Sequence, residues 1–598
     1  MPPAECRRWR RQGTDRMKLT KRLVLALLLA TATPVLADAA TDAAFKDIYT
    51  REWTWRMDQF DYDEDSAAGR TTLPDVDVKT QQARLAYWQK VMTELDALDA
   101  KQLSPAAAVN YGVYRNQIAT LIASQQYRDY EMPLNSDSSF WGDLASTGNA
   151  PFKTAKQYRN WTQQMNAVPR YFDQQTDNLK LGLARGFTPP KVTLQGRDSS
   201  VASVAQAKRA EDTVYYKPFV KMPASIAPAE QAQLRAEAVK AINEQVIPAH
   251  AKLLTFLKND YIPNARVPLA AYSLPDGKAF YQSKIAEFTT LNLTPEAIHQ
   301  IGLDEVAKIR AQMQQVKTQT GFKGDLPAFL HFLRTDPQFY VTDPQDLLNR
   351  AAWIAKQFDG KASTYFGHNP RGRFTIRPVP ADIAPFYTAG RGGTGTYMLN
   401  TYDLPSRPTY ALRALTLHES APGHSWQMSL AQENKDMPDF RRKVYISAFG
   451  EGWALYAEKL GNEMGMYETP YDMFGMLSYQ MWRAARLVVD TGIHSKGWTR
   501  EQAQAFLRDN TALSNHEIET EVDRYIGWPG QALAYYLGEM SIEKSRAKAE
   551  AALGPKFNIR AFHDTVLAMG SVPLPVLEAR VDEFIASGGV GPYPDEEK

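Results

Sequence analysis

Apolar and aromatic residues recur three and four positions apart along most of this chain, and this spacing limits its possible folds more than any other feature. The segment QQARLAYWQKVMTELDAL, residues 81–98, is typical, and similar patterns cover Thr41 to Gln125, Tyr410 to Gly461 and Tyr471 to Ala552. Such spacing places the apolar residues on one face of a helix. With 598 residues, 44% of them hydrophobic, the chain can bury one very large core or two packed lobes. The sequence therefore predicts a mainly α fold.

The strongest internal break is YIPNARVPLAAYSLPDG, residues 261–277, where prolines and a glycine follow a helical segment. We expect a single domain over residues 38–598, and 262–277 is the place where it could divide into two lobes. A new helix is predicted after the break, with Thr294 as its N-cap and Pro295 in its first turn.

Residues 375–403 are the main β candidate, because TIRPVP and TYMLN combine β-branched and aromatic residues between prolines and glycines. Gly390, Gly392 and Gly395 lie between these runs and match a dinucleotide-binding fingerprint in letters. That motif needs a preceding strand and a following helix, and here a strand-like run follows instead. We expect a turn leading into an exposed edge strand, which could pair with an extended peptide.

The first 37 residues differ from the rest of the chain. A basic run precedes the apolar run Leu23–Ala30, and small or apolar residues precede Ala37. This order is typical of a secretory signal peptide cleaved after Ala37, and Met17 is the more plausible start. The apolar run is too short for a permanent membrane anchor. We therefore expect a periplasmic or secreted protein with no stable membrane anchor.

The only cysteine, Cys6, precedes the apolar run, so the predicted mature chain has no thiol for a disulfide, a metal or a nucleophile. Residues 1–37 carry 8 Lys/Arg and 2 Asp/Glu, which leaves 61 basic and 65 acidic residues after cleavage. A slightly acidic protein without a basic tract is not expected to bind nucleic acid.

The segment LHESAPGHSWQ, residues 417–427, contains a His-Glu pair and a second histidine. Zinc hydrolases commonly place two histidines four residues apart on a helix, with a glutamate after the first as general base. Here His418 and His424 are six residues apart, or about 240° around a regular helix. An unbroken helix would therefore point the two imidazoles in different directions.

Two residues between the histidines predict an interruption. Pro422 has no amide hydrogen, and its ring clashes with the carbonyl of His418, four residues earlier. Gly423 tolerates unusual backbone angles. We expect the helix to bulge or break after Ala421 and so to return His424 to the face of His418.

A third ligand is predicted in FGEGWALYAEKLG, where Glu451 lies between two glycines and Glu458 follows seven residues later on the same helix face. Glu451 could approach an ion closely, and Glu458 could accept the other ring N–H of a ligand histidine. Alternatively, both carboxylates are solvated or ion-paired on a surface helix. The apolar and aromatic neighbours favour burial, and a buried carboxylate needs a partner.

The sequence resembles the bacterial DUF885 family from about residue 45 to 585, through LTLHESAPGH, EGWALYAE, GTYMLNTYDLPSRP and EVDRYIGWPGQALAYYLG. The hallmark of that family is HExxPGH followed by an EGWAxxxE helix. The resemblance implies a large, helical, two-lobed fold similar to gluzincin-type zinc peptidases, with a small sheet beside the active-site cleft. It implies His418, His424 and Glu451 as ligands of one zinc ion, and Glu419 as the general base. Family members often carry a second histidine at the position of Ser425.

The segment DRYIGWPGQALAYY contains a second Pro-Gly interruption, Pro529-Gly530, between Tyr525 and Tyr535. Either phenol could donate a hydrogen bond to the oxyanion formed during hydrolysis, and Arg524 could hold a substrate carboxylate. Aromatic packing and an ion pair with a neighbouring acid explain these residues equally well. The remaining predicted substrate-binding residues are Tyr397 and Asn400.

These features favour an exported zinc peptidase that hydrolyses short peptides. Two alternatives share the same residues: a periplasmic binding protein with this fold and no turnover, and a zinc esterase or amidase. Zinc content separates the first alternative, and a substrate panel separates the second. The sequence sets no oligomeric state.

Overall fold

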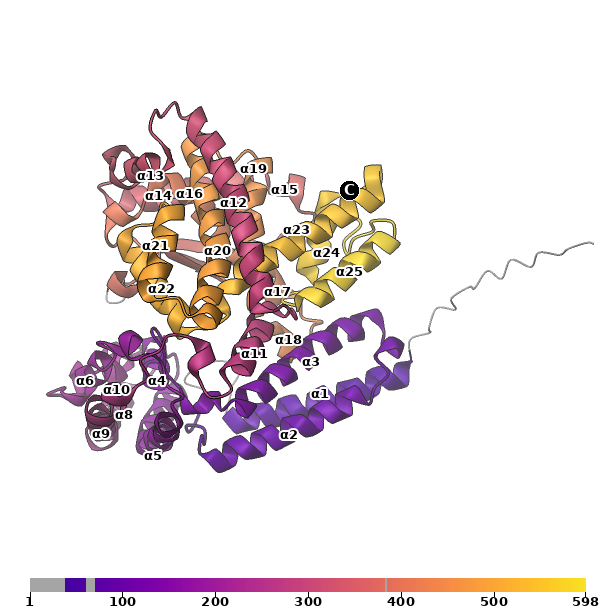
Figure 1. The fold of residues 1–598 in the computed structure, drawn as a ribbon. Coiled ribbons are helices and arrows are strands. Elements are labelled where there is room, and N and C mark those ends of the chain that lie inside the picture. The colour runs from indigo at the N-terminus through magenta and orange to yellow at the C-terminus, as the bar shows by residue number, and fades with distance from the viewer. Residues whose placement is uncertain (1–37, 61–69, 382–383, 598) are drawn as a thin grey trace, which may run out of the picture.

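The computed structural model describes residues 38–597 except 61–69 and 382–383 (Figure 1). The expected signal segment, with Cys6 and Met17, lies outside the described residues. The described chain is mainly helical with one small sheet, which confirms the fold class predicted from the helical spacing. None of the described helices is long and apolar enough to cross a membrane.

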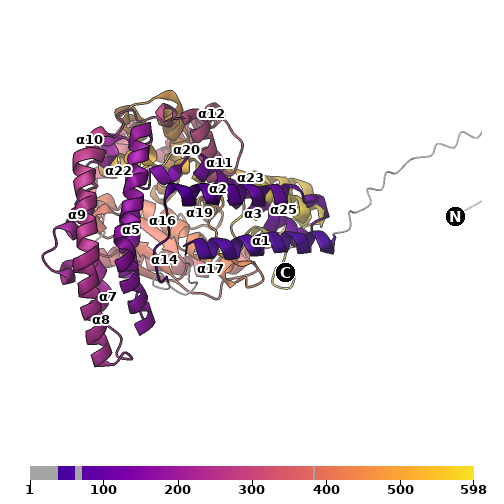
Figure 2. The same cartoon turned by 90° about the horizontal axis from the view of Figure 1, so that it is seen from below.

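Three long helices open the described chain: α1 (Ala39–Phe60), α2 (Val78–Asp96) and α3 (Pro105–Gln126). Figures 1 and 2 show them side by side beneath the later helices. Asp77 caps α2 by accepting from the N–H of Thr80, and Ser104 caps α3 ahead of a proline at its first position. Their buried residues belong to the main apolar core of the molecule.

The following segment forms a second lobe with an apolar core of its own, built almost entirely from residues 134–265. Its helices are α4 (Phe140–Ser146), α5 (Ala155–Arg185), α6 (Ser199–Ala205), α7 (Lys217–Val220), α8 (Pro228–Ala241), α9 (Ile247–Phe256) and α10 (Ile262–Asn264). Apart from Phe187, the main core resumes at Ala271, so the change of core falls inside the Pro-rich break at 262–277. The second lobe is therefore an insertion between α3 and the remainder of the main core.

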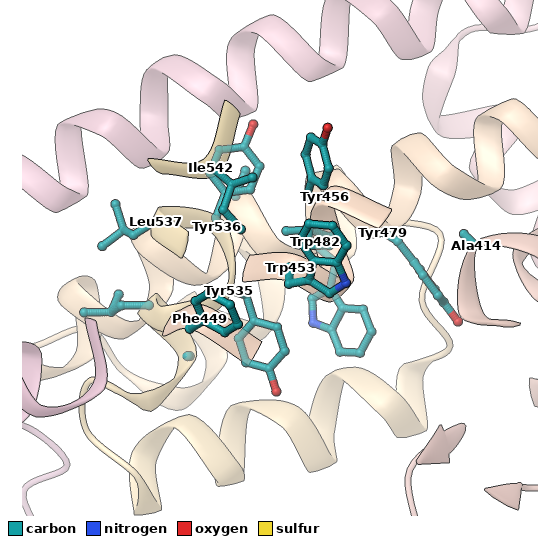
Figure 3. Close-up of a cluster of buried hydrophobic side chains, with 14 of the residues drawn as sticks. Ala414, Phe449, Trp453, Tyr456, Tyr479, Trp482, Tyr535, Tyr536, Leu537 and Ile542 are labelled. Carbon is teal, nitrogen blue, oxygen red and sulfur yellow. The ribbon is translucent and has the colours of Figure 1, made fainter. Parts of the chain in front are cut away.

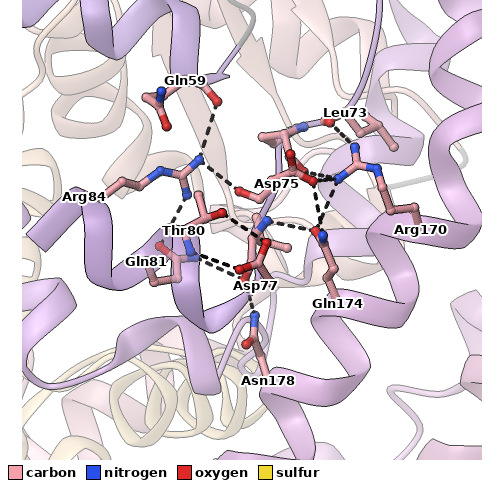
Figure 4. Close-up of polar contacts among 12 residues, drawn as sticks. Gln59, Leu73, Asp75, Asp77, Thr80, Gln81, Arg84, Arg170, Gln174 and Asn178 are labelled. Atoms are coloured by element: carbon pink, nitrogen blue, oxygen red, sulfur yellow. Dashed lines mark hydrogen bonds and ion pairs between the residues drawn. The ribbon is translucent and has the colours of Figure 1, made fainter.

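A polar junction fixes the second lobe to the N-terminal helices (Figure 4). The backbone of Val76 donates to Gln174 of α5 at 2.9 Å and accepts from Asn178 at 2.7 Å. From the other side, Arg84 of α2 donates to the carbonyl of Asp75 at 2.9 Å. Since side chains satisfy this extended backbone from both helices, α2 and α5 are held in a defined relation.

The main lobe is built around α20 (Pro470–Lys496), which is buried on almost every side. Thr469 and Asp472 form a capping box at its start, and Gly497 ends it with a φ of 72°. The other helices of this lobe are α11 (Gly277–Thr289), α12 (Pro295–Gln319), α13 (Leu326–Thr335), α14 (Pro344–Asp359), α15 (Ala362–Tyr365), α16 (Thr409–Glu419), α17 (His424–Glu433), α18 (Asp439–Arg442), α19 (Ser447–Glu463), α21 (Arg500–Asn510), α22 (Asn515–Gly527), α23 (Ala534–Leu553), α24 (Ile559–Ala568) and α25 (Leu574–Ala586). The predicted cap of α12 is confirmed, because the Thr294 side chain accepts from the N–H of Ala297.

α19 and α23 touch through their backbones. A Cβ on Gly452 would lie 2.4 Å from the carbonyl carbon of Gly538, and a Cβ on Gly538 would lie 2.0 Å from the carbonyl oxygen of Ala448. This close approach brings aromatic side chains of both helices into one buried cluster, with Phe449 and Tyr536 among those labelled in Figure 3. α19 carries two of the predicted site residues, so this packing sets their position.

A three-stranded sheet lies beside α16: β1 (Thr375–Pro378), β2 (Gly390–Gly393) and β3 (Thr396–Leu399), in the order β1-β3-β2. β3 pairs parallel with β1 and antiparallel with β2. The two predicted strand segments are confirmed, but the expectation of a turn leading into an edge strand is wrong. The glycine run is itself the edge strand, and TYML is the central strand. Glycine permits this because a Cβ on Gly392 would lie 1.7 Å from the carbonyl oxygen of Glu419.

Candidate metal centre

The interruption between the two histidines is present, but it begins earlier than expected. α16 ends at Glu419 and α17 begins at His424, so the helix stops before Ser420 and not after Ala421. Ser420 has φ −104° and ψ −104°, outside the helical region, and the Ala421–Pro422 peptide bond is cis. The proline excludes helical geometry from the residues before its ring as well as at its own nitrogen, which moves the break towards the N-terminus.

Gly423 closes the turn between the helices. Its N–H donates to the carbonyl of Leu417 at 3.0 Å, and a Cβ at this position would lie 1.9 Å from the carbonyl oxygen of His418. The indole of Trp453 on α19 donates to the carbonyl of Pro422 at 2.8 Å. A residue with a side chain does not fit here, and the turn is fixed to the helix that carries the third predicted ligand.

The three predicted ligands come together at one point. The imidazole centroids of His418 and His424 lie 4.8 Å apart, with their planes at 88°. The Nε2 atoms of His418 and His424 lie 3.6 and 3.3 Å from the same oxygen, Oε2 of Glu451 on α19. One donor atom from each of the three residues lies within 4.8 Å of the other two. All three side chains are largely shielded from solvent.

Carboxylates surround His418 on both ring nitrogens. Its Nδ1 lies 2.7 Å from Oε1 of Glu458, which follows Glu451 by seven residues on α19. Burial by itself would lower the pKa of His418, but the hydrogen bonds to Glu451 and Glu458 raise it to about 10. Burial would likewise raise the pKa of Glu451, yet the two imidazoles hold it well below its usual range. The site thus attracts positive charge strongly.

These donors suit a zinc ion by their chemistry and number. Two imidazole nitrogens and one carboxylate oxygen converge, which is a ligand set that leaves a fourth position for water or substrate. Glu458 accepts from the distal nitrogen of His418, the arrangement that fixes which nitrogen of a histidine faces a metal. The alternative, in which Glu451 and Glu458 lie on a surface helix, does not apply, because Glu458 is fully buried.

Glu419 lies beside the three donors, at the C-terminal end of α16. Its carboxylate oxygen Oε2 accepts from the backbone N–H of Gly392 on β2 at 2.6 Å. Its side chain faces the same cavity as the three donors. The glycine strand therefore orients the predicted general base, a contact that no spacing in the sequence indicates.

Comparison with known protein families assigns this chain to one of them. The model of the DUF885 family, described as bacterial proteins of unknown function, matches residues 62–581. The chain belongs to the DUF885 family. A search of the curated proteins gives no match.

Two solved structures are similar in fold to this chain. A "putative lipoprotein" of Colwellia psychrerythraea is 24% identical, with a TM-score of 0.83, and the match covers 92% of this chain and 99% of that one. A "putative lipoprotein of unknown function" of Shewanella oneidensis is 19% identical, with a TM-score of 0.62 over 90% of this chain and 98% of that one. At these identities the likeness is one of fold.

A cavity of about 2080 Å³ contains the candidate metal centre of this DUF885 protein. Its walls include α1 and α3, the second-lobe segment 192–200, the edge strand β2, and helices α16, α19, α20 and α22. It therefore lies between the N-terminal helices, the second lobe and the main lobe. Space of this size accommodates a chain of several residues but not a folded protein.

Two residues next to the centre were not predicted from the sequence. The hydroxyl of Tyr445 donates to Oε1 of Glu451 at 3.1 Å, and a Cβ on Gly450 would lie 2.4 Å from the Tyr445 ring. The glycine before Glu451 was the available signal, since it makes room for that ring. Arg391 of β2 lines the same cavity; burial tends to lower its pKa, but Tyr387 and then Glu419 and Glu451 raise it.

The two tyrosines flanking Pro529-Gly530 have different environments. Tyr525 is 1% exposed, and its hydroxyl accepts from Trp482 and from Arg486, each at 2.9 Å. It is not among the residues that line the cavity, so the expectation that it points into the cleft is wrong. Tyr535 does line the cavity, and its hydroxyl accepts from Arg524 at 3.2 Å. Helix α22 continues to Gly527 and therefore carries Tyr525 into the core before the interruption.

Tyr397 and Asn400 are buried and are not among the residues that line the cavity, so the structure does not bring these two predicted residues to the site. Alternation along β3 turns the Tyr397 ring into the core. Asn400 donates to the carbonyls of Ala384, Tyr387 and Thr388 at 2.9 to 3.2 Å. It thereby holds the loop before β2, part of which forms the cavity wall.

Proposed function

We propose that this DUF885 protein is an exported, zinc-dependent peptidase. The observation that supports the proposal most strongly is the convergence of His418, His424 and Glu451 with Glu419 beside them in one cavity. A zinc ion held by the first three residues would polarise a peptide carbonyl and lower the pKa of a water molecule. A structural ion would not need a carboxylate and an open cavity next to it.

Glu419 is the proposed general base. Its Oε2 is held by Gly392, so the carboxylate has a fixed orientation towards the centre. From there it accepts a proton from the attacking water and later delivers it to the leaving amine. Tyr387, Tyr445 and Tyr535 line the cavity, and Tyr445 or Tyr535 would donate a hydrogen bond to the tetrahedral oxyanion.

The edge strand β2 provides a place for an extended peptide. The N–H of Asn400 donates to the carbonyl of Ala389 at 2.9 Å, so Ala389 and Asn400 form a hydrogen-bonded pair of the antiparallel ladder. Such pairs alternate, and Gly390 and Gly392 therefore turn their backbone groups away from β3. One of these groups, the N–H of Gly392, already holds Glu419. A substrate pairing with the others would lie alongside the catalytic carboxylate, which favours a peptide over a small ester.

Export of the protein is part of the proposal. Residues 1–37 have the order of a cleaved signal peptide, and the two solved relatives are described as lipoproteins. Cys6 precedes the apolar run, so no thiol follows it for lipid attachment. Sequencing the N-terminus of the protein from the periplasmic or secreted fraction is expected to read from Asp38.

Glu419→Gln tests the reaction. The zinc content, measured on protein reloaded after chelation, is expected to stay at one ion per chain. Hydrolysis of a mixed peptide library is expected to fall by about 10²–10⁴-fold, since proton transfer is lost. The matched control is Glu244→Gln, on an exposed part of the second lobe, which should keep both properties.

Three results would count against this function. Wild-type protein without zinc affinity would favour a binding protein. Zinc binding with no cleavage of any peptide, but with cleavage of esters or simple amides, would favour the alternative hydrolase. Undiminished cleavage by Glu419→Gln would remove the proposed base.

A further inference from the structure

Three arginines form part of the cavity wall next to the metal centre. Arg483 and Arg486 come from the central helix α20, and Arg524 comes from the end of α22; all three line the cavity. Arg483 and Arg486 are 4% and 2% exposed, so the protein has largely removed them from bulk water. Burying a guanidinium is unfavourable unless an anion and hydrogen-bond acceptors compensate it.

That compensation is incomplete. Arg483 lies 3.6 Å from Glu458, while Glu521 is shared between Arg486 at 2.9 Å and Arg524 at 3.5 Å. In the part of the chain that the structure describes, the three guanidinium groups thus form ion pairs with only two carboxylates. Nε and Nη1 of Arg483 and Nη1 of Arg486 also lack a hydrogen-bond partner among those residues.

Aromatic rings hold these guanidinium groups in place. The Arg483 and Arg486 guanidinium carbons lie 4.3 and 4.4 Å from the ring centroid of Trp482, and Arg486 also lies 4.3 Å from that of Tyr535. Figure 3 labels Tyr479, Trp482 and Tyr535 within the same cluster. Stacking against fixed rings restricts the rotation of the arginines, so the unpartnered N–H groups are preorganised.

These three residues, Arg483, Arg486 and Arg524, are called the arginine wall, and they lie next to the candidate metal centre. Only the Glu458 carboxylate separates Arg483 from His418, since Oε1 of Glu458 contacts both. On the opposite side, Arg524 contacts the hydroxyl of Tyr535, which lines the same cavity as Tyr445 and Glu451. An anion bound by the wall would therefore belong to a residue close to the scissile bond.

We infer that Arg483, Arg486 and Arg524 bind a substrate carboxylate, so that the substrate is a peptide whose free C-terminal carboxylate lies near the bond to be cleaved. This inference rests on the proposed peptidase function and specifies its substrate class. A planar carboxylate offers the two acceptor oxygens that paired guanidinium donors match. The same chemistry is present in an aspartate or glutamate side chain, and the experiment separates these two sources.

The experiment measures binding without turnover. Zinc-loaded Glu419→Gln protein is titrated calorimetrically with one apolar tetrapeptide in three forms: the free acid, the C-terminal amide, and the amide with glutamate as its last residue. The free acid is expected to bind at least about 10-fold more tightly than the apolar amide, because the free acid supplies the missing anion and that amide does not. Tight binding of the glutamyl amide at the level of the free acid would assign the wall to an acidic side chain and overturn the terminal assignment.

Variants in the same background identify the residues. Arg483→Gln and Arg486→Gln are expected to remove the preference for the free acid, and the corresponding lysine variants to restore only part of it. If the two buried variants do not fold, Arg524→Gln makes the same test at a more exposed side chain. Arg500→Gln is the control, because Arg500 lines the cavity but is already paired with Asp523 at 2.6 and 2.9 Å.

The outcomes distinguish this inference from the peptidase proposal. Equal binding of the free acid and the amide overturns the inference, even if wild-type protein cleaves both. An arginine-dependent preference in a protein that cleaves no peptide would support the carboxylate site and reject the peptidase function. In an active enzyme, amidation is expected to raise KM at least about 10-fold, and the Arg486→Gln variant to abolish that difference.

Discussion

His418 of the candidate metal centre and three histidines elsewhere in the core are almost equally buried, yet their pKa values shift in opposite directions. His418 is 2% exposed and has a pKa raised to about 10. His250, His494 and His563 are at most 1% exposed, and burial lowers their pKa values to about 4, 3 and 3. Burial alone therefore does not decide the charge of these side chains; their partners do.

The partners differ in kind. His563 has its Nδ1 2.8 Å from the carbonyl of Tyr365 and its Nε2 2.8 Å from the hydroxyl of Tyr456, so the neutral ring is fully satisfied. His418 has carboxylates on both nitrogens, and a second imidazole shares one of them. The first environment stabilises a neutral structural residue. The second has excess negative charge, which a proton or a metal cation can balance.

Paired histidine variants give the largest expected contrast. His424→Ala removes one of three donors, so we expect zinc content to fall from one ion per chain to near zero after dialysis at micromolar zinc. His563→Gln is expected to keep the full zinc content, although it loses the packing and hydrogen bonds of a buried ring. Zinc is measured by atomic emission on folded protein. Full zinc retention by His424→Ala would show that His424 and His563 do not differ in their contribution to zinc binding.

A second test disturbs the turn that unites the two imidazoles. Gly423→Ala places a Cβ against the carbonyl oxygen of His418, at 1.9 Å before any relaxation. We expect a loss of about 1–3 kcal/mol in unfolding free energy and a weaker zinc affinity, because relief of the clash moves His424. Gly393→Ala is the matched control, since a Cβ there meets nothing within 4 Å. Unchanged zinc affinity in a destabilised Gly423→Ala protein would show that the turn serves folding alone.

The contribution of the carboxylate behind His418 is smaller. Glu458→Gln keeps the size of the side chain but removes the charge that orients the ring nitrogen. Zinc affinity, measured by competition with a chelator of known strength, is expected to fall about 10–100-fold, while one ion still binds at saturation. Glu463→Gln on the same helix is the control, because Glu463 pairs with Arg546 near the surface. An equal loss in both variants would assign the effect to general charge and not to the contact with His418.

The parts of the centre that could be predicted are those set by local covalent geometry. A proline and a glycine between two histidines exclude a regular helix, and six residues of separation then need a turn to bring the rings together. Glu451 and Glu458 follow from a seven-residue separation on one helix face. The helices themselves follow from apolar spacing, which depends only on neighbours along the chain.

The parts that failed depend on packing between distant segments. Tyr525 was expected in the cleft because a Pro-Gly pair follows it, but Trp482 and Arg486 of another helix bind its hydroxyl inside the core. The glycine run was expected to be a turn, whereas the close approach of Glu419 makes it a strand. Neither partner is visible in the local sequence pattern, because no residue near Tyr525 or Gly392 along the chain indicates it.

The smallest expected effect is the change in stability that His563 causes over a single pH unit. Unfolded histidine binds a proton below pH 6.5, but folded His563 does so only near pH 3. Because the unfolded state binds more protons in this interval, stability is lost as pH falls from 6.5 towards 3, by about 1.4 kcal/mol per pH unit. His563→Gln removes this contribution, so its deficit relative to wild type should shrink below pH 6.5 in urea unfolding of chelated protein. His331→Gln, at an exposed position, is the control for the substitution itself. A deficit of His563→Gln that does not change with pH would mean that folding does not lower the pKa of this ring.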